Sequence, residues 1–212
     1  MITADSLLPT IRKIVASYLE EIGTSESQQN QYIFIFITEA LRKLANIAYV
    51  MRVSDPMTIS GEGFITFQRS GQSIIDLYAP LRIMDSTGKE VVKRTAYADT
   101  KSGWWRESSN TPIHVKGLNG AYTLHYIAYP STVASASSPV EFPDAGSLGL
   151  SYHVAAMIME SRPHAKDLAA HYYALSQRYL KIAVQANIDA RGHSSGGFVP
   201  SLNTVDSAFG GG

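Results

Sequence analysis

A match to a catalytic motif lies near the carboxyl end of the sequence. Gly192-His193-Ser194-Ser195-Gly196 has the G-x-S-x-G spacing of a nucleophile elbow, in which a tight turn between a strand and a helix exposes the serine. Here the motif follows a helical pattern and enters a Gly/Ser-rich segment, and no histidine comes after His193. These features favour a flexible hinge over a hydrolase that uses Ser194 as its nucleophile.

The histidines and acids lack the spacing of a metal or catalytic site. None of the six histidines forms an H-E-x-x-H pattern, and the absence of cysteine excludes thiolate ligands, cysteine nucleophiles and disulfides. His164 and His171 are seven residues apart on one predicted helix face, which is more typical of an exposed stripe than of a metal site. We therefore predict no catalytic residues, no cofactor and no metal, and we expect that the protein is not an enzyme.

Aromatic residues and charge leave one binding function open. Trp104-Trp105, together with the twelve tyrosines, could form a stacking platform, so a carbohydrate-binding β-module is an alternative from a different class. The 18 basic and 18 acidic residues balance, which argues against a sequence-independent DNA-binding protein, because such a protein needs clustered Lys and Arg. Only 17% of the residues are charged, below the usual ~25%, and this indicates that another chain covers part of the surface.

Two helices are predicted in residues 1–52. The first extends over about residues 5–22 and ends at Gly23, and a polar loop follows over residues 24–30. The second extends over about residues 31–49, and its core face leaves Phe34 and Ile35 pointing elsewhere. A helix that is apolar nearly all round is buried on both sides. We therefore predict that Phe34 and Ile35 lie at an interface with a neighbouring subunit.

Residues 53–146 have the alternating pattern of a small antiparallel β-domain. Short apolar runs are separated by turn signals such as Asp85-Ser86-Thr87-Gly88. Asn119-Gly120 is the pair favoured in type I′ turns, so a hairpin is expected there. The strand that follows, residues 121–129, has the clearest pattern in the chain.

Helical patterns return over residues 147–190. One helix begins near Leu148 and is broken at Ser161-Arg162-Pro163. The final helix carries apolar residues alternately four and three apart, the spacing of a packed helix seam: Leu168, Tyr172, Leu175, Tyr179, Ile182 and Ala186. The expected fold class is α+β, with a bundle of N- and C-terminal helices, an inserted small antiparallel β-domain and a flexible C-terminal tail.

The tail, residues 191–212, is rich in glycine and cannot form a core of its own. Its spaced apolar residues could serve as anchors in the groove of another protein: Phe198, Val199, Leu202, Val205 and Phe209. At the other end, residues 1–6 carry an acid where a signal peptide would carry basic residues. The longest apolar run has six residues, far fewer than the ~20 that span a bilayer, so we expect no contact with a membrane.

The order of the elements and several short motifs resemble a known family. A helix with residues 38–45 leads into a β-insertion that closes with residues 122–130, and a Phe142-Pro143 step precedes two helices with residues 150–156 and 169–179. Over about residues 5–190 this layout is similar to the head-to-tail adaptor (connector) proteins of tailed bacteriophages. The stretch 88–111, with its tryptophan pair, departs from the family pattern.

The resemblance implies a virion structural protein at the head–tail junction, made in the host cytoplasm. Adaptors of this kind form a homo-oligomeric ring, typically a dodecamer, beneath the portal protein. The ring continues the DNA channel and is the platform on which tail or nozzle proteins dock, and the tail of the chain would contact the portal or a neighbouring subunit. Genomic DNA passes through the lumen without specific binding, which fits a net charge of zero. Another neck or tail-completion ring protein is the alternative within this class.

Overall fold

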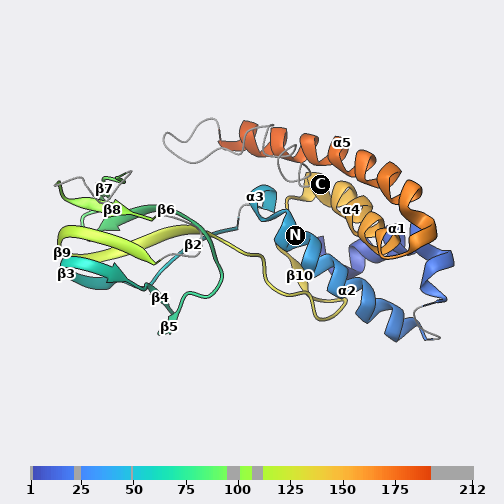
Figure 1. The fold of residues 1–212 in the computed structure, drawn as a ribbon, viewed down its shortest axis with the longest axis horizontal. Helices are drawn as coiled ribbons and strands as arrows, with labels where there is room; N and C mark the ends of the chain where they lie inside the picture. Colours follow the sequence, from blue (N-terminus) through green and yellow to red (C-terminus); the bar gives the residue numbers. More distant parts are fainter. Residues whose placement is uncertain (1, 22–24, 49, 95–100, 107–111, 192–212) are drawn as a thin grey trace. The chain divides into compact units, whose positions relative to one another are not determined.

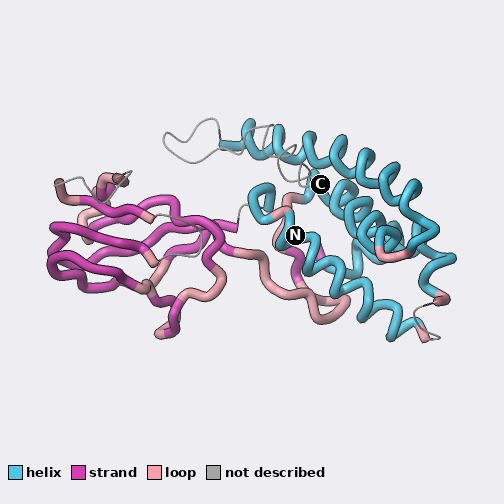
Figure 2. Tube along the Cα trace, viewed as in Figure 1, coloured by secondary structure: helices cyan, strands magenta, loops and turns pink. Residues whose placement is uncertain are grey.

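The computed structural model describes residues 2–21, 25–48, 50–94, 101–106 and 112–191, with side chains described as far as Gln185. The chain divides into two compact units, one from residues 1–50 and 130–212 and one from residues 51–129. Figure 2 shows that nearly all helix lies in the first unit and most strands lie in the second. The fold is therefore α+β, as predicted from the sequence.

The helical unit is organised around α4. The helices and 3₁₀ turns are α1 (Ala4–Leu19), α2 (Glu26–Lys43), α3 (Ala45–Ala48), η1 (Asp144–Gly146), α4 (Ser147–Glu160), η2 (Pro163–Ala165) and α5 (Lys166–Arg191). Helix α4 contacts α1, α2 and α5 (Figure 1), and of its residues only Glu160 is exposed. A helix that is apolar on every side needs cover on every side, so the other helices pack around α4.

Helix α2 begins at Glu26, earlier than the sequence pattern indicated. The hydroxyl of Ser25 accepts a hydrogen bond from the backbone N–H of Gln28, and the Gln28 side chain accepts one from the N–H of Ser25, which makes a capping box. The prediction of a polar loop over residues 24–30 is wrong, because polar residues here form the first turns of a capped helix. The helix ends at Lys43, and the short α3 follows.

Segment 130–146 belongs to the helical unit and not to the β-domain, in which the sequence analysis had placed it. Strand β10 (Pro139–Val140) pairs in an antiparallel way with β1 (Ile2–Thr3). The N–H of Val133 donates a 3.0 Å hydrogen bond to the hydroxyl of Thr38, which itself donates to the carbonyl of Phe34 over 2.9 Å. Thr38 is buried, so this hydroxyl connects the segment to the interior face of α2.

The Thr38 hydroxyl gives a test of this connection. Thr38→Val keeps the shape of the side chain but leaves the buried N–H of Val133 without its acceptor, which costs about 1–3 kcal/mol. We expect the free energy of unfolding, measured with urea, to fall by that amount, and the amide of Val133 to exchange faster with solvent. Thr58→Val on an exposed strand position is the control and should change stability by less than about 0.5 kcal/mol. Equal effects of the two substitutions would contradict this role of Thr38.

The β unit is built on one long strand, β9 (Ile113–Ala128). Its partners within one sheet are β2 (Val50–Val53), β3 (Met57–Ile65), β6 (Leu77–Asp85) and β8 (Gly103–Trp105), and β7 (Glu90–Val91) extends the sheet beyond β6. The pairings of β9 with β3, β6 and β8 are antiparallel. Strands β4 (Gln68–Arg69) and β5 (Gln72–Ser73) form a separate hairpin.

The hairpin predicted at Asn119-Gly120 is wrong, because β9 continues through both residues. Both residues pair with β3, where Ile59 lies opposite Gly120. The Asn119 side chain accepts a hydrogen bond from the N–H of Gly61. The tight turn with two positive φ angles lies instead at Ser70 (54°) and Gly71 (74°), between β4 and β5. Positive φ at both central residues is the requirement of a type I′ turn. The turn predicted at residues 85–88 is confirmed, with Asp85 accepting hydrogen bonds from Thr87 and Lys89.

Candidate assembly surface

Phe34 and Ile35 point in different directions, although the sequence placed both at a subunit interface. Phe34 is only 7% exposed and belongs to the core of the helical unit, so its placement off the core face is wrong. Ile35 is 56% exposed and lies beside the half-buried aromatic pair of Tyr32 and Phe36, whose ring centroids are 4.8 Å apart. We call the exposed Ile35 and the exposed parts of Tyr32 and Phe36, which also pack against the core, the Ile35 surface of α2.

A matched pair of substitutions distinguishes the two positions. Phe34→Asp places a charge in the core of the helical unit and should lower the free energy of unfolding by more than about 3 kcal/mol. Ile35→Asp places the same charge on an exposed site and should change it by about 0.5 kcal/mol or less. Thermal unfolding followed by circular dichroism measures both. A large loss of stability for Ile35→Asp would place this side chain in the interior.

The regular stripe on α5 lies largely outside the core. Tyr172 of the predicted seam packs against the core, but the fully buried residues of the helix form another set: Ala169, Ser176, Leu180, Ala183 and Val184. On the predicted seam, Leu168 is 41% exposed, Ile182 is 53% exposed, and Tyr172, Leu175 and Tyr179 are half-buried. We call these five residues the outer stripe; Ala186, the last residue of the predicted seam, has no described side chain. Helix α5 therefore has a core face and a second apolar face beside it.

Close contact between α4 and α5 fixes which face of α5 turns inward. A side-chain carbon placed on Gly149 would lie 3.0 Å from the backbone nitrogen and side chain of Leu180. The buried hydroxyl of Ser176 donates a 2.9 Å hydrogen bond to the carbonyl of Gly149. Only small residues allow two helices to come this close, so Gly149 and Ser176 direct the adjoining face of α5 toward α4.

Tyrosines join the outer stripe to α4. The ring of Tyr152 lies 5.9 Å from that of Tyr172 and 5.5 Å from that of Tyr179, within the range of favourable aromatic contacts. Tyr152 was not singled out in the sequence, because no spacing within its own helix links it to the tyrosines of α5. The three rings make one half-buried aromatic surface across two helices.

The tryptophan pair lies in the interior of the β unit. Trp104 is 0% exposed and Trp105 is 3% exposed, and both lie in β8. The indole N–H of Trp104 donates a hydrogen bond to the carbonyl of Val91, and the ring of Trp105 lies 4.0 Å from that of His114. Because both indoles are buried, they offer no exposed stacking surface for a sugar ring.

One histidine is held in the core of the helical unit. His153 of α4 is 3% exposed, and its ring lies 5.2 Å from the ring of Tyr173 on α5. Burial and the nearby Lys43 lower the pKa of His153 to about 4. The folded chain thus holds this imidazole in its neutral form at pH 7, in a structural position.

The low pKa of His153 predicts a loss of stability in acid. In the unfolded chain the imidazole takes up a proton near pH 6.5, whereas in the folded chain it does so only near pH 4. Stability should therefore decrease as the pH falls from 6.5 to 4, by up to about 3 kcal/mol from this group. His153→Phe should remove most of that decrease in urea unfolding at pH 7 and pH 4.5. The same decrease in both proteins would contradict a buried neutral His153.

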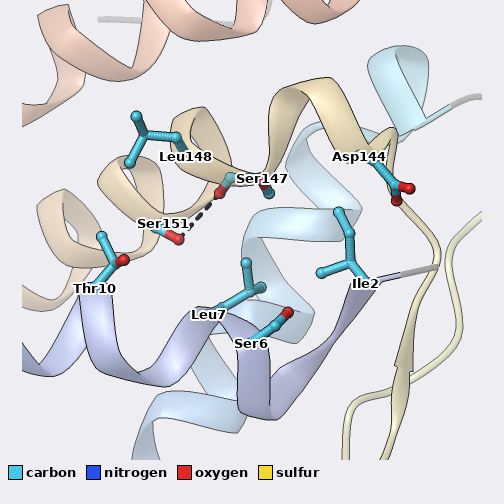
Figure 3. A pocket seen from close by; sticks show the side chains of 8 residues that line it. All are labelled: Ile2, Ser6, Leu7, Thr10, Asp144, Ser147, Leu148 and Ser151. Carbon is cyan, nitrogen blue, oxygen red and sulfur yellow. Dashed lines mark hydrogen bonds between the residues drawn. The ribbon is translucent and has the colours of Figure 1, made fainter.

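A pocket of about 310 Å³ lies between α1 and α4. Figure 3 shows Ser6, Leu7 and Thr10 of α1 on one side and Ser147, Leu148 and Ser151 of α4 on the other, with Asp144 near Ile2. Two of the hydroxyls donate within their own helix ends, since Ser151 donates to the carbonyl of Ser147 and Ser6 to that of Thr3. Asp144 is the one titratable side chain of the lining, so the pocket holds no acid–base pair.

The remaining candidates lie outside the described residues or make ring contacts on the helices. His193, Ser194 and the five apolar tail residues Phe198, Val199, Leu202, Val205 and Phe209 lie outside the described residues. His164 lies 5.7 Å from Tyr18, and His171 lies 5.4 Å from Tyr172, between ring centroids. In the ranges that the structure describes, no three His, Asp or Glu side chains are placed to hold a metal ion.

A comparison with protein-family models finds no match, and neither does a comparison with curated proteins. In the described part of the chain, no helix combines the length and the apolar character needed to cross a membrane. The features that carry a functional inference are therefore the outer stripe on α5 and the Ile35 surface on α2.

Proposed function

We propose that the chain is a virion structural protein, the head-to-tail adaptor of a tailed bacteriophage. In this proposal, copies of the chain form a ring, typically of twelve, under the portal protein. The ring continues the DNA channel and provides the surface on which tail proteins dock. The resemblance in the order of elements supports the assignment to adaptor proteins. The outer stripe on α5 is the single observation on which the inference of ring assembly rests.

A closed ring requires two unlike surfaces on each subunit. In a head-to-tail interface, one surface of a subunit meets a different surface of the next, and the rotation closes the ring. The outer stripe on α5 supplies one apolar surface, and Ile35 with Tyr32 and Phe36 on α2 supplies another. We infer that the α5 stripe of one subunit packs on the α2 surface of its neighbour.

Other features support assembly rather than chemistry. The buried Trp104 and Trp105 remove the surface on which the carbohydrate-binding alternative depended. A net charge of zero suits a channel that must let DNA pass without holding it. In the assembled ring, the tail with Phe198 and Phe209 reaches the portal or a neighbouring subunit. Another ring protein of the phage neck would use the same surfaces. The position of the ring in the virion would distinguish such a protein from a head-to-tail adaptor.

Oligomer formation tests the proposal directly. Electron microscopy and mass photometry of the purified chain should show closed rings. Ile182→Asp on the α5 stripe and Ile35→Asp on α2 should each raise the concentration for half-assembly by about tenfold or more, which corresponds to ~1.4 kcal/mol. The folded state should be kept in both, because the two positions are exposed.

The control for this experiment is Val92→Asp in the β unit. Val92 is 55% exposed, close to the 53% of Ile182, so the same charge enters at the same degree of exposure. Assembly of Val92→Asp should match that of the unchanged chain. A chain that stays monomeric at every concentration, or equal disruption by all three substitutions, would refute the proposed interface.

A further inference from the structure

The pocket between α1 and α4 has a lining of mixed character (Figure 3). Its eight residues comprise four with a hydroxyl group, one with a carboxylate and three with aliphatic side chains: Ser6, Thr10, Ser147, Ser151, Asp144, Ile2, Leu7 and Leu148. Ile2, Leu7 and Ser151 are buried, whereas Ser6 and Asp144 are exposed. A ligand that enters from solvent therefore contacts both polar groups and buried apolar side chains.

Two of the four hydroxyl groups have already used their proton. Ser151 donates a 3.0 Å hydrogen bond to the carbonyl of Ser147, the contact dashed in Figure 3, and Ser6 donates a 2.6 Å hydrogen bond to the carbonyl of Thr3. A serine hydroxyl has one O–H donor and two acceptor lone pairs. The oxygens of Ser6 and Ser151 can therefore only accept a further hydrogen bond, so a ligand must supply the donor.

Asp144 adds a negative charge to these acceptors. An ionised carboxylate is an acceptor only, and its two oxygens have about four acceptor positions, so Asp144 can bind a ligand in addition to partners within the chain. Among the described residues that line the pocket, none is Lys, Arg or His. The lining therefore favours a ligand that carries both hydrogen-bond donors and positive charge.

The amino end of α4 does not reverse this preference. Helix N-termini attract anions through backbone N–H groups that have no partner within the helix. Here η1 continues directly into α4, and the N–H of Ser147 donates to the carbonyl of Asp144 while the N–H of Gly146 donates to that of Pro143. These two N–H groups are therefore occupied, and an anion would also meet the carboxylate of Asp144.

We propose that this pocket binds a small aliphatic amine. The ammonium group has three N–H donors, which pair with the carboxylate of Asp144 and with hydroxyl oxygens of the lining. The alkyl chain contacts the aliphatic side chains Ile2, Leu7 and Leu148. The volume of about 310 Å³ is at the lower end of the range for small-molecule pockets, which suits a ligand of this size. The site lies within one helical unit and does not depend on ring formation.

Three probes of equal chain length test the chemistry of the site. The full-length chain is titrated at pH 7 with pentylamine, pentanol and pentanoate, and binding is followed by saturation-transfer NMR of the ligand, which works for monomers and for assemblies. We expect pentylamine to bind with a dissociation constant of about 1 mM or lower. Pentanol has the same apolar chain without the charge and should bind about tenfold more weakly, and pentanoate should bind more weakly still.

Two matched substitutions locate the bound amine. Asp144→Asn keeps the size of the side chain but removes its charge, and should raise the dissociation constant of pentylamine about tenfold. Asp167→Asn, at an exposed position in the first turn of α5, is the control and should leave it unchanged. Leu148→Ala shortens the apolar wall and should weaken binding several-fold.

Three results would overturn the proposal. The first is no binding of pentylamine up to about 10 mM. The second is equal affinity for pentylamine and pentanol, which would mean that the pocket selects only for the apolar chain. The third is an equal effect of Asp144→Asn and Asp167→Asn, which would mean that the amine responds to overall charge and not to this pocket.

Discussion

The burial of α4 on every side is the constraint on which the helical unit depends. Ten of its fourteen residues are buried, and α1, α2 and α5 all contact it. At Gly149 the absence of a side chain leaves room for Leu180 of α5, and the carbonyl of Gly149 accepts a hydrogen bond from Ser176. This contact fixes the orientation of α5 about its own helix axis. The regular stripe with Leu168 and Ile182 therefore lies beside the α4–α5 contact and not within it.

That orientation leaves α5 with two apolar faces. A helix that serves only the core has a single apolar stripe and a polar remainder. Helix α5 has a core face of small residues such as Ala169 and Ala183 and a second face of larger ones such as Leu175 and Tyr179. The neutral His153 lies in the packed interior of the helical unit, and the pocket beside Asp144 lies between α1 and α4. The second face of α5 therefore gives the clearest indication of function.

Much of this fold could be predicted from the sequence, and the misses have physical causes. Apolar periodicity gave the fold class, most helices and the central strand, because it reports burial directly. It could not distinguish Phe34 from Ile35, since neighbouring residues on a helix differ by only ~100° and the size of the core decides which one is enclosed. It placed a hairpin at Asn119-Gly120, whereas pairing with β3 keeps that strand continuous and the positive φ angles fall at Ser70 and Gly71. The stripe on α5 was found by its spacing, but its position relative to the core depended on contacts of Gly149 that no local pattern reveals.

The central claim is that a neighbouring subunit covers the outer stripe of α5 in the assembled protein. Carbene labelling of the full-length chain, read out by mass spectrometry, measures this directly. The chain supplies its own references: Ile75 is 96% exposed and Leu180 is 0% exposed. The account predicts that Leu168 and Ile182 are labelled nearly as weakly as Leu180 in the assembled protein, and that dilution to the monomer raises their labelling several-fold. Labelling of Leu168 and Ile182 as strong as that of Ile75 in the assembled protein would contradict it.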